Sequence, residues 1–502
     1  MKMVKSLLLG SAAGLVAMAG AQAADLPVKA KPVEYVKVCS LYGEGFFYIP
    51  GTDTCIKIGG WVRAEYVVGG AGSHSNFISG GGGLNTTGGT PDSYFRARTV
   101  ISADVRTQTE YGTLRAYYRA GFTHDTNMVV GVLYPEMAFI QFAGFTFGKT
   151  RSYFDFFAGV FSYTSYPGGG SVTGFGGQLL AAYTAQFGNG ISATIAAEDA
   201  TQRRNAIWDG GQNLLRAGGL PGPLQNVISG VGGCTFAPAA TDTAAAGVFG
   251  AAFGGCPIGD YAAHSIPDIV ASLRVDQAWG SAQIAGALHQ VNGNYYGNNV
   301  ANGDLAGVFT APVGDKFGFA VMGGLVLNVP TAPGDKFWIE GTYSEGAPSY
   351  NGLANNALYS SFLRRNGGFA AAGWALDAVI GSTTNTYDAF GLPAAGTQSG
   401  IQLTKALTVG AAFEHYWTPA LRTSVWGNWN SIDFNAIASS IMCNGNVLIP
   451  GGTSPYTTAV GCNPDFRVWA VGTRTIWNPV KNLDIGLEVM YAKIEQDNAP
   501  TV

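Results

Sequence analysis

The sequence predicts an all-β protein whose strands form a transmembrane antiparallel β-barrel, and three observations lead to this class. Charged residues make up only 12% of the 502 residues while Gly occurs 73 times, and soluble domains carry roughly twice that charged fraction. The mean hydropathy is +0.14, and beyond the N-terminus no apolar run reaches the roughly 20 residues that a membrane-spanning helix needs. Polar and apolar residues alternate along many short segments, and only a closed barrel of such strands hides its edges from lipid.

The alternation is clearest in residues 93–123, where successive side chains of a strand would face water and lipid in turn. Ile101 and Val105 share one face of the first segment, and Tyr118 and Phe122 share the same face of the second, after a turn. This pattern predicts a hairpin with one apolar and one charged face. The charged face carries Arg96, Arg98, Asp104, Arg106, Arg115 and Arg119.

Fifteen strands follow from this pattern and from the Gly, Asn and Pro residues that tight turns select. Short and long connections alternate between them, as in outer-membrane barrels, which have short periplasmic turns and long outer loops. A soluble β-sandwich has no reason to sort its connections in this way. The expected strands are 56–68, 93–107, 112–123, 136–142, 145–150, 178–187, 191–200, 266–277, 281–292, 315–328, 335–346, 401–417, 420–433, 465–477 and 482–494.

An odd number of strands conflicts with a closed barrel, because bacterial single-chain barrels have an even number and unpaired edges are costly in lipid. The sequence stops at Ala499-Pro500-Thr501-Val502 with no amphipathic, aromatic-ended segment. We therefore expect that this chain lacks its last strand. A strand overlooked at 369–381 is the alternative.

The N-terminus has the pattern of an export signal. Lys2 and Lys5 precede an apolar stretch, and Ala21-Gln22-Ala23 has the small-x-small form of a cleavage site. We expect residues 1–23 to be a signal peptide and residues 24–502 to form the barrel, with a short membrane anchor as the alternative. Removal of the two lysines takes the net charge from −4 to −6, which argues against nucleic acid as a partner, since phosphate binding needs a clustered basic surface.

Six cysteines follow the signal and form three pairs that are close in sequence. An exported protein reaches an oxidising compartment, where disulfides form. Six cysteines allow about 15 connectivities, and a preference for short loops favours sequential pairing. A zinc site is the alternative, but the tight C-x-x-C ligand pairs that it needs are missing. The expected structural disulfides are Cys39–Cys55, Cys234–Cys256 and Cys443–Cys462.

Three segments resemble one family. Residues 38–66, VCSLYGEGFFYIPGTDTCIKIGGWVRAEY, resemble the N-terminal signature of the alphaproteobacterial outer-membrane porins, which are general diffusion porins. Residues 139–157, FIQFAGFTFGKTRSYFDFF, are similar to the stretch that leads into their infolded pore loop, and residues 407–430, LTVGAAFEHYWTPALRTSVWGNWN, resemble a late hairpin. The resemblance implies a 16-stranded homotrimeric channel that admits small hydrophilic solutes and ions by passive diffusion, without a cofactor. Family members close with a terminal strand that ends in an aromatic residue, and this chain departs from that pattern.

Charged side chains on the first three strands would line the pore of such a barrel, because charges at the constriction set its selectivity. The alternative is that some of these arginines lie near the periplasmic rim or pair locally with Glu65 and Asp104. If the polar face points inward, the basic sector consists of Lys57, Arg63, Arg96, Arg98, Arg106, Arg115 and Arg119.

The candidate constriction loop near 151–177 holds a single carboxylate, Asp155. Facing the basic sector, this acid would create a transverse field that steers ions. With one acid against several arginines, we expect a weak anion preference. The loop is also rich in aromatic residues, whose rings either pack it against the inner wall or narrow the eyelet. Its candidate residues are Arg151, Tyr153, Asp155, Phe156 and Tyr163.

No motif predicts an enzyme. The sequence lacks G-x-S-x-G and H-E-x-x-H, and no Gly run continues into the Lys-Ser or Lys-Thr of a phosphate loop. The five histidines are scattered, and His289 falls on a polar strand face, where we expect a solvated wall residue. No metal or cofactor is expected.

The expected function is therefore that of a porin in the cell outer membrane of a Gram-negative bacterium, reached through the periplasm and embedded in outer-membrane lipid. Two other functions stay open. A solute-specific channel is one, for which the aromatic loop is a hint. A surface adhesin or receptor barrel is the other, because the segment 201–265 is long enough to carry a binding epitope.

Overall fold

The computed structural model describes residues 37–68, 93–126, 132–156, 161–163, 170–171, 173, 177–210, 261–262, 265–296, 312–353, 375–384, 386, 393–444 and 463–496. The chain divides into two compact units, residues 1–56 and residues 57–502. The expected signal peptide and the cysteines 234, 256 and 462 lie outside the described residues.

The first unit is held by a disulfide between Cys39 and Cys55, whose Cα atoms are 6.1 Å apart. Its elements are the short helix η1 (Ser40–Tyr42) and the two-residue strand β1 (Phe47–Tyr48), which pairs with the beginning of β2. Both cysteines are buried beside the ring of Phe46. The first of the three expected disulfides is thus confirmed.

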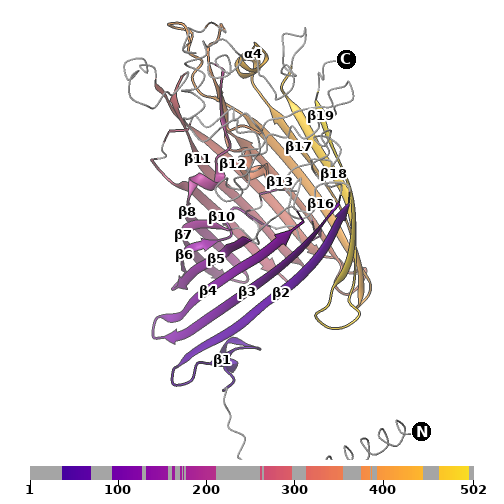
Figure 1. Cartoon of the computed structure of the whole chain (residues 1–502). Coiled ribbons are helices and arrows are strands. Elements are labelled where there is room, and N and C mark those ends of the chain that lie inside the picture. The colour runs from indigo at the N-terminus through magenta and orange to yellow at the C-terminus, as the bar shows by residue number, and fades with distance from the viewer. Residues whose placement is uncertain are drawn as a thin grey trace, which may run out of the picture. The chain divides into compact units, whose positions relative to one another are not determined.

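One antiparallel sheet contains 16 strands in chain order, and Figure 1 shows its long strands side by side in that order. The sequence predicted fifteen of these strands, and the sixteenth is β1. The long strands are β2 (Thr54–Val68), β3 (Ser93–Thr109), β4 (Gly112–Asp125), β5 (Val132–Phe142), β6 (Phe145–Thr150), β7 (Gln178–Gly188), β8 (Ile191–Glu198), β10 (Asp268–Gln277), β11 (Gly280–Tyr295), β12 (Pro312–Asn328), β13 (Lys336–Glu345), β16 (Lys405–Thr418), β17 (Leu421–Asp433), β18 (Phe466–Trp477) and β19 (Ile485–Gln496).

The sheet is open at its ends: among the described strands, β19 pairs with β18 and no pairing joins it to β2. Within the alternative strand at 369–381, the described residues 375–381 are not part of this sheet. Its described portion contains β14 (Ala378–Ile380), which pairs with β9 (Ile207–Asp209) and β15 (Gln402–Leu403) in a separate three-stranded sheet. No helix among the described residues is both long enough and apolar enough to span a membrane.

Exposure alternates along the strands as the sequence pattern predicts. On β3, Ile101 is 59% exposed and its neighbour Val100 only 1%. We call the face with the exposed apolar side chains the outer face and the opposite one the inner face. The outer face is the surface that a barrel presents to lipid, and it carries Ile101, Tyr118, Phe122, Ile140, Phe147, Leu179, Ile195, Leu273, Ile284, Val321, Val425, Leu487 and Val489, all exposed.

The three-stranded sheet packs between two groups of strands. Trp208 and Val379 belong to one apolar cluster with Ile432 of β17 and Phe466 of β18. The alternate residues Ile207, Ala378 and Ile380 belong to another cluster with Val291 of β11, as expected when successive side chains of a strand point to opposite faces. The small sheet therefore bridges the β11 side and the β17–β18 side of the large sheet.

Helix α4 (Ala436–Asn444) supports the first of these clusters through Ile441 and Met442, which are fully buried. It begins after Asn435, whose side-chain oxygen accepts a hydrogen bond from the Ala438 N–H at 2.9 Å, a standard way to satisfy a free donor at a helix start. Cys443 in this helix is disulfide-bonded.

The turn between β12 and β13 is fastened to strand β16 by one buried carboxylate. Asp335 accepts a hydrogen bond from the Tyr416 N–H at 2.8 Å, lies 2.7 Å from His415 Nδ1 and also accepts from the Thr331 hydroxyl. Burial by itself raises the pKa of Asp335, but these donors outweigh it and hold the pKa below its ordinary value.

We expect Asp335→Ala to destabilise the folded protein near neutral pH and to destabilise it less in strong acid. Because the folded-state pKa lies below the ordinary value of 3.8, the carboxylate stabilises the fold above about pH 4, and this contribution is lost as the pH falls through the folded-state value. Unfolding temperatures measured at about pH 7 and about pH 2 test this. Thr331→Val, which removes one donor, should show a smaller loss, and an equal loss for Asp335→Ala at both pH values would contradict the assignment.

Candidate functional site: an arginine wall and an anchored loop

The basic residues predicted from the sequence lie on the first three long strands, at positions that alternate with the exposed apolar residues. Arg106 of β3 stands directly opposite Arg115 of β4, and Arg119 stands opposite Ser102. Lys57, near the beginning of β2, is exposed. We call the arginines of this part of the inner face the arginine wall: Arg63, Arg96, Arg98, Arg106, Arg115 and Arg119.

Carboxylates of the same strands compensate part of this charge. Asp104 pairs with Arg106 at 2.8 Å and with Arg115 at 2.9 Å. Glu65 pairs with Arg63 at 3.1 Å and lies 3.6 Å from Arg96. The alternative that some arginines pair locally with Glu65 and Asp104 is therefore confirmed.

A third acid, Glu136 of β5, was not predicted. It is fully buried and pairs with Arg119 at 2.5 Å. The register of β4 against β5 shifts here, because Arg119 stands opposite Met137 while Ala120 stands opposite Pro135. Such a bulge re-aims side chains, so Glu136 and Met137 are both buried although they are neighbours in sequence. Simple alternation could not find this acid.

The candidate loop leaves β6 and packs against the inner face of the sheet. The Tyr153 N–H donates to Glu198 of β8 at 3.0 Å, and the Tyr153 hydroxyl donates to Thr146 of β6 at 3.0 Å. The Gln283 amide of β11 donates to the Phe154 carbonyl at 3.2 Å. Arg151, the first residue of the loop, is exposed. The first half of the loop is thus fixed to β6, β8 and β11.

Aromatic rings of the loop pack on the wall. Phe154 is fully buried and meets the ring of Tyr350 edge-on at 4.7 Å. Phe156 lies so close to β12 that a Cβ placed at Gly324 would come within 2.2 Å of Cδ1 of Phe156. Glycine at this position makes the close approach possible. The packing interpretation of the aromatic loop holds for these residues.

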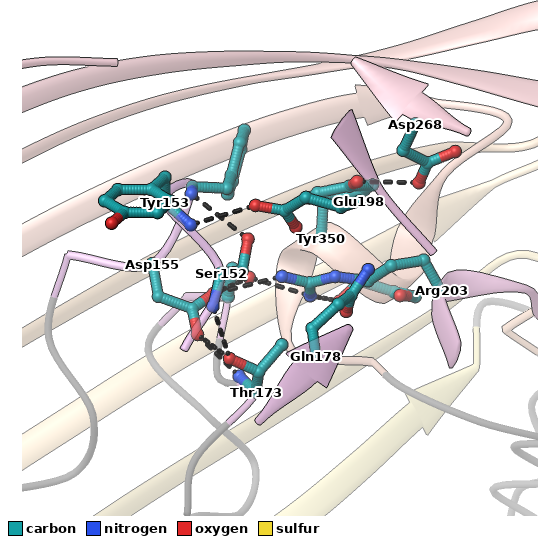
Figure 2. Close-up of polar contacts among 12 residues, drawn as sticks. Ser152, Tyr153, Asp155, Thr173, Gln178, Glu198, Arg203, Asp268 and Tyr350 are labelled. Carbon is teal, nitrogen blue, oxygen red and sulfur yellow. Dashed lines mark hydrogen bonds and ion pairs between the residues drawn. The ribbon is translucent and has the colours of Figure 1, made fainter. Parts of the chain in front are cut away.

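Asp155 does not face the arginine wall, so the expected opposition between this acid and the wall is wrong. Its carboxylate is buried and pairs with Arg203 of helix η2 (Ala200–Arg203) at 3.1 Å, as Figure 2 shows. It also accepts hydrogen bonds from the Ser171 hydroxyl at 2.5 Å and from the Thr173 N–H at 2.7 Å. Asp155 thus joins the beginning of the loop to Ser171 and Thr173 near its end. A buried ion needs a partner, and no sequence motif marks Arg203 as that partner.

The guanidinium of Arg203 is the centre of this anchor. It stacks over the ring of Tyr350 at 4.3 Å and donates to the Ser171 hydroxyl at 2.9 Å. Burial by itself would lower the pKa of Arg203, but the charge of Asp155 more than offsets this and the pKa lies above its usual value. The guanidinium of Arg203 therefore stays charged at any physiological pH.

A second anchor holds the tip of the loop to the last strands. The Phe161 carbonyl accepts from Ser424 of β17 at 2.5 Å, and the Tyr163 N–H donates to Glu488 of β19 at 2.5 Å. The Ser162 hydroxyl also donates to Glu488. The described part of the loop therefore contacts strands from β6 to β19.

His289 is not the solvated wall residue that the sequence indicated. It is fully buried, with Nδ1 2.8 Å from Asp268 of β10 and Nε2 3.7 Å from Asp377, just before β14. Tyr261 donates to Asp377 at 2.5 Å. Burial raises the pKa of Asp377, and His289 and Tyr261 oppose the rise. The cluster ties the small sheet to the inner face.

No group of three or more His, Cys, Asp or Glu residues in the described part of the chain is arranged to hold a metal ion. The site instead consists of a fixed loop on one part of the inner face and a partly compensated basic surface on another. Such an arrangement can filter solutes by size and charge.

Comparison with known proteins decides the family. The sequence model of the porin subfamily matches residues 25–502. The chain belongs to the porin subfamily. This confirms the resemblance to alphaproteobacterial outer-membrane porins, and two Brucella porins of similar sequence support the same assignment.

Porin Omp2b of Brucella abortus (strain 2308) is 36% identical over 245 residues, which cover 45% of this porin and 61% of Omp2b. Porin Omp2a of Brucella ovis is 33% identical over 259 residues, covering 45% of this porin and 66% of Omp2a. The porin therefore matches only about three fifths of the length of Omp2b. Among solved structures, the outer membrane channel DcaP of Acinetobacter baumannii has a TM-score of 0.52 at 14% identity and covers 89% of this chain, with 92% of its own chain matched. This likeness shows a shared fold.

We expect Arg203→Leu to release the loop, because it leaves the buried Asp155 without its cation, which costs about 3–5 kcal/mol. Cleavage of the loop by a protease should become faster, and the susceptible bonds should lie within residues 151–177. Adding Asp155→Asn to Arg203→Leu should restore much of the resistance, since it removes the uncompensated charge. Unchanged cleavage in the single variant would show that the ion pair does not hold the loop.

Proposed function

We propose that this porin forms a water-filled channel for the passive diffusion of small hydrophilic solutes and ions across the outer membrane. The observation that carries the proposal is the division of one antiparallel sheet into an apolar outer face and a charged inner face, with a loop fastened to the inner face. An apolar outer face suits lipid and a polar interior suits water. Membership of the porin subfamily favours a channel over an enzyme.

The protein lies in the outer membrane of a Gram-negative bacterium, as the family and the fold indicate. We assign it a homotrimeric assembly on the basis of its resemblance to the alphaproteobacterial porins. The exposed apolar side chains of the outer face would then be shared between lipid and neighbouring subunits.

The arginine wall is the proposed selective surface. Lys57 and the six arginines give seven positive charges, and Glu65, Asp104 and Glu136 give three negative ones, so these ten described side chains together carry an excess of four positive charges. Asp155 does not offset this positive charge, because its carboxylate is paired with Arg203. A surface with excess positive charge raises the local concentration of anions.

We expect stepwise conductance in a planar bilayer, with a reversal potential of anionic sign in a salt gradient. Arg98→Gln combined with Arg115→Gln should shift the reversal potential towards zero, because two of the excess charges are lost from the wall. Lys493→Gln on β19 is the matched control, since that lysine is exposed and paired with Glu495 away from the wall. A reversal potential of cationic sign would overturn the anion preference, and a folded protein without conductance would favour a surface receptor instead.

A further inference from the structure

Arginines and aromatic rings alternate up the inner face of β3, β4 and β5. Residues that stand opposite each other on these strands form rows across the sheet, about 7 Å apart along the strand. Arg106, Arg115 and Gln141 form one row, and the next contains Tyr117 beside Phe139. The rows above contain Arg119, then Tyr134, and then Arg98.

Three of these guanidinium groups, those of Arg115, Arg119 and Arg98, lie over aromatic rings. Arg115 is 5.0 Å from the ring centre of Tyr117, and Arg98 is 5.1 Å from that of Tyr134. Trp61 of β2 lies between Arg119 at 6.0 Å and Arg63 at 5.7 Å. We call this set the arginine–aromatic ladder: Arg115, Tyr117, Arg119, Trp61, Tyr134 and Arg98.

The ladder offers two kinds of contact at each step. A guanidinium fork binds a carboxylate through two parallel hydrogen bonds, and a ring or the flat guanidinium face stacks on a planar apolar group. Arg98 is the clearest case, because this half-buried side chain places its guanidinium over the ring of Tyr134. A solute that has both a carboxylate and a flat ring matches this spacing of contacts.

Neighbouring acids offset part of the arginine charge, so a solute would bind each arginine of the ladder only weakly and could move on. Arg115 shares Asp104 and Arg119 holds Glu136, and both arginine side chains are still 27% and 15% exposed. A solute carboxylate therefore competes with these acids for the same donors. Conduction needs binding sites that attract a solute strongly enough for it to enter and hold it weakly enough for it to leave. A row of half-neutralised arginines satisfies both conditions.

We infer that the ladder is a binding path for aromatic carboxylates, which this channel passes in preference to non-aromatic carboxylates of equal charge and similar size. The inference rests on the proposed channel function and adds a solute class to it. The charged wall alone would favour all small anions alike. The interleaved rings are what discriminate between them.

The test is a bi-ionic measurement with sodium benzoate on one side of the bilayer and sodium cyclohexanecarboxylate on the other. The two anions share charge and approximate size, and only benzoate has a π face. We expect benzoate to be more permeant by roughly twofold to tenfold, the range that one ring stacking contact gives. The double variant Trp61→Leu with Tyr134→Leu should bring the ratio to about one while the anionic sign against sodium chloride persists.

Matched controls separate the ladder from the fold and from the proposed function. Tyr118→Leu changes the residue next to Tyr117 on the outer face, where the ring is 49% exposed, and should leave the benzoate preference intact. Equal permeability of the two anions through the unaltered channel would overturn the ladder alone. A silent but folded protein would overturn the channel, and the ladder would then be decided in detergent by saturation-transfer NMR. Benzoate signal that Tyr134→Leu abolishes would support it, and absence of signal would refute it.

Discussion

The structure depends on one constraint: a backbone that crosses lipid must satisfy every N–H and C=O group within itself. The strands from β3 to β18 meet it by pairing with a neighbour on each side in chain order, while β2 and β19 stand at the two ends of the open sheet. Pairing in this order fixes the direction of the side chains wherever the register is regular, because residues two apart share a face. The apolar outer face and the charged inner face are therefore consequences of the same backbone arrangement, and so is the stacking of the arginines into rows across β3 and β4.

Within this frame, buried charges position the parts that no strand pairing controls. Asp155 and Arg203 fasten the beginning of the loop, Glu488 fastens its tip, and His289 between Asp268 and Asp377 fastens the small sheet. A buried ion pair contributes little net stability, because desolvation offsets the attraction, but breaking it is costly. Such pairs suit the proposed channel, whose constriction would have to keep one shape while solutes pass.

The arginine wall and the loop occupy different parts of the inner face. The loop is bound to strands from β6 to β19, whereas the wall stands on β2, β3 and β4. The one carboxylate of the loop, Asp155, is paired within the anchor of the loop. In the proposed channel, the wall therefore sets the charge that a solute meets. The wall carries acids among its arginines, which moderates its field. The aromatic rings beneath the guanidinium groups would add, in the inferred binding path, a contact that depends on solute shape as well as on charge.

The sequence by itself determined the fifteen long strands, the faces of β3 and β4 and the short turns, because strand periodicity and turn chemistry are local properties. It favoured the Cys39–Cys55 bond through the short loop that this bond closes, and the structure confirms it. Only the tertiary structure decided that Asp155 is buried against Arg203, that the bulge opposite Arg119 turns Glu136 inward, and that His289 is enclosed by two carboxylates. These contacts join residues far apart in the chain or depend on a single extra residue in a strand. Alternation places a side chain on a face of the sheet, and long-range packing selects the group that it meets there.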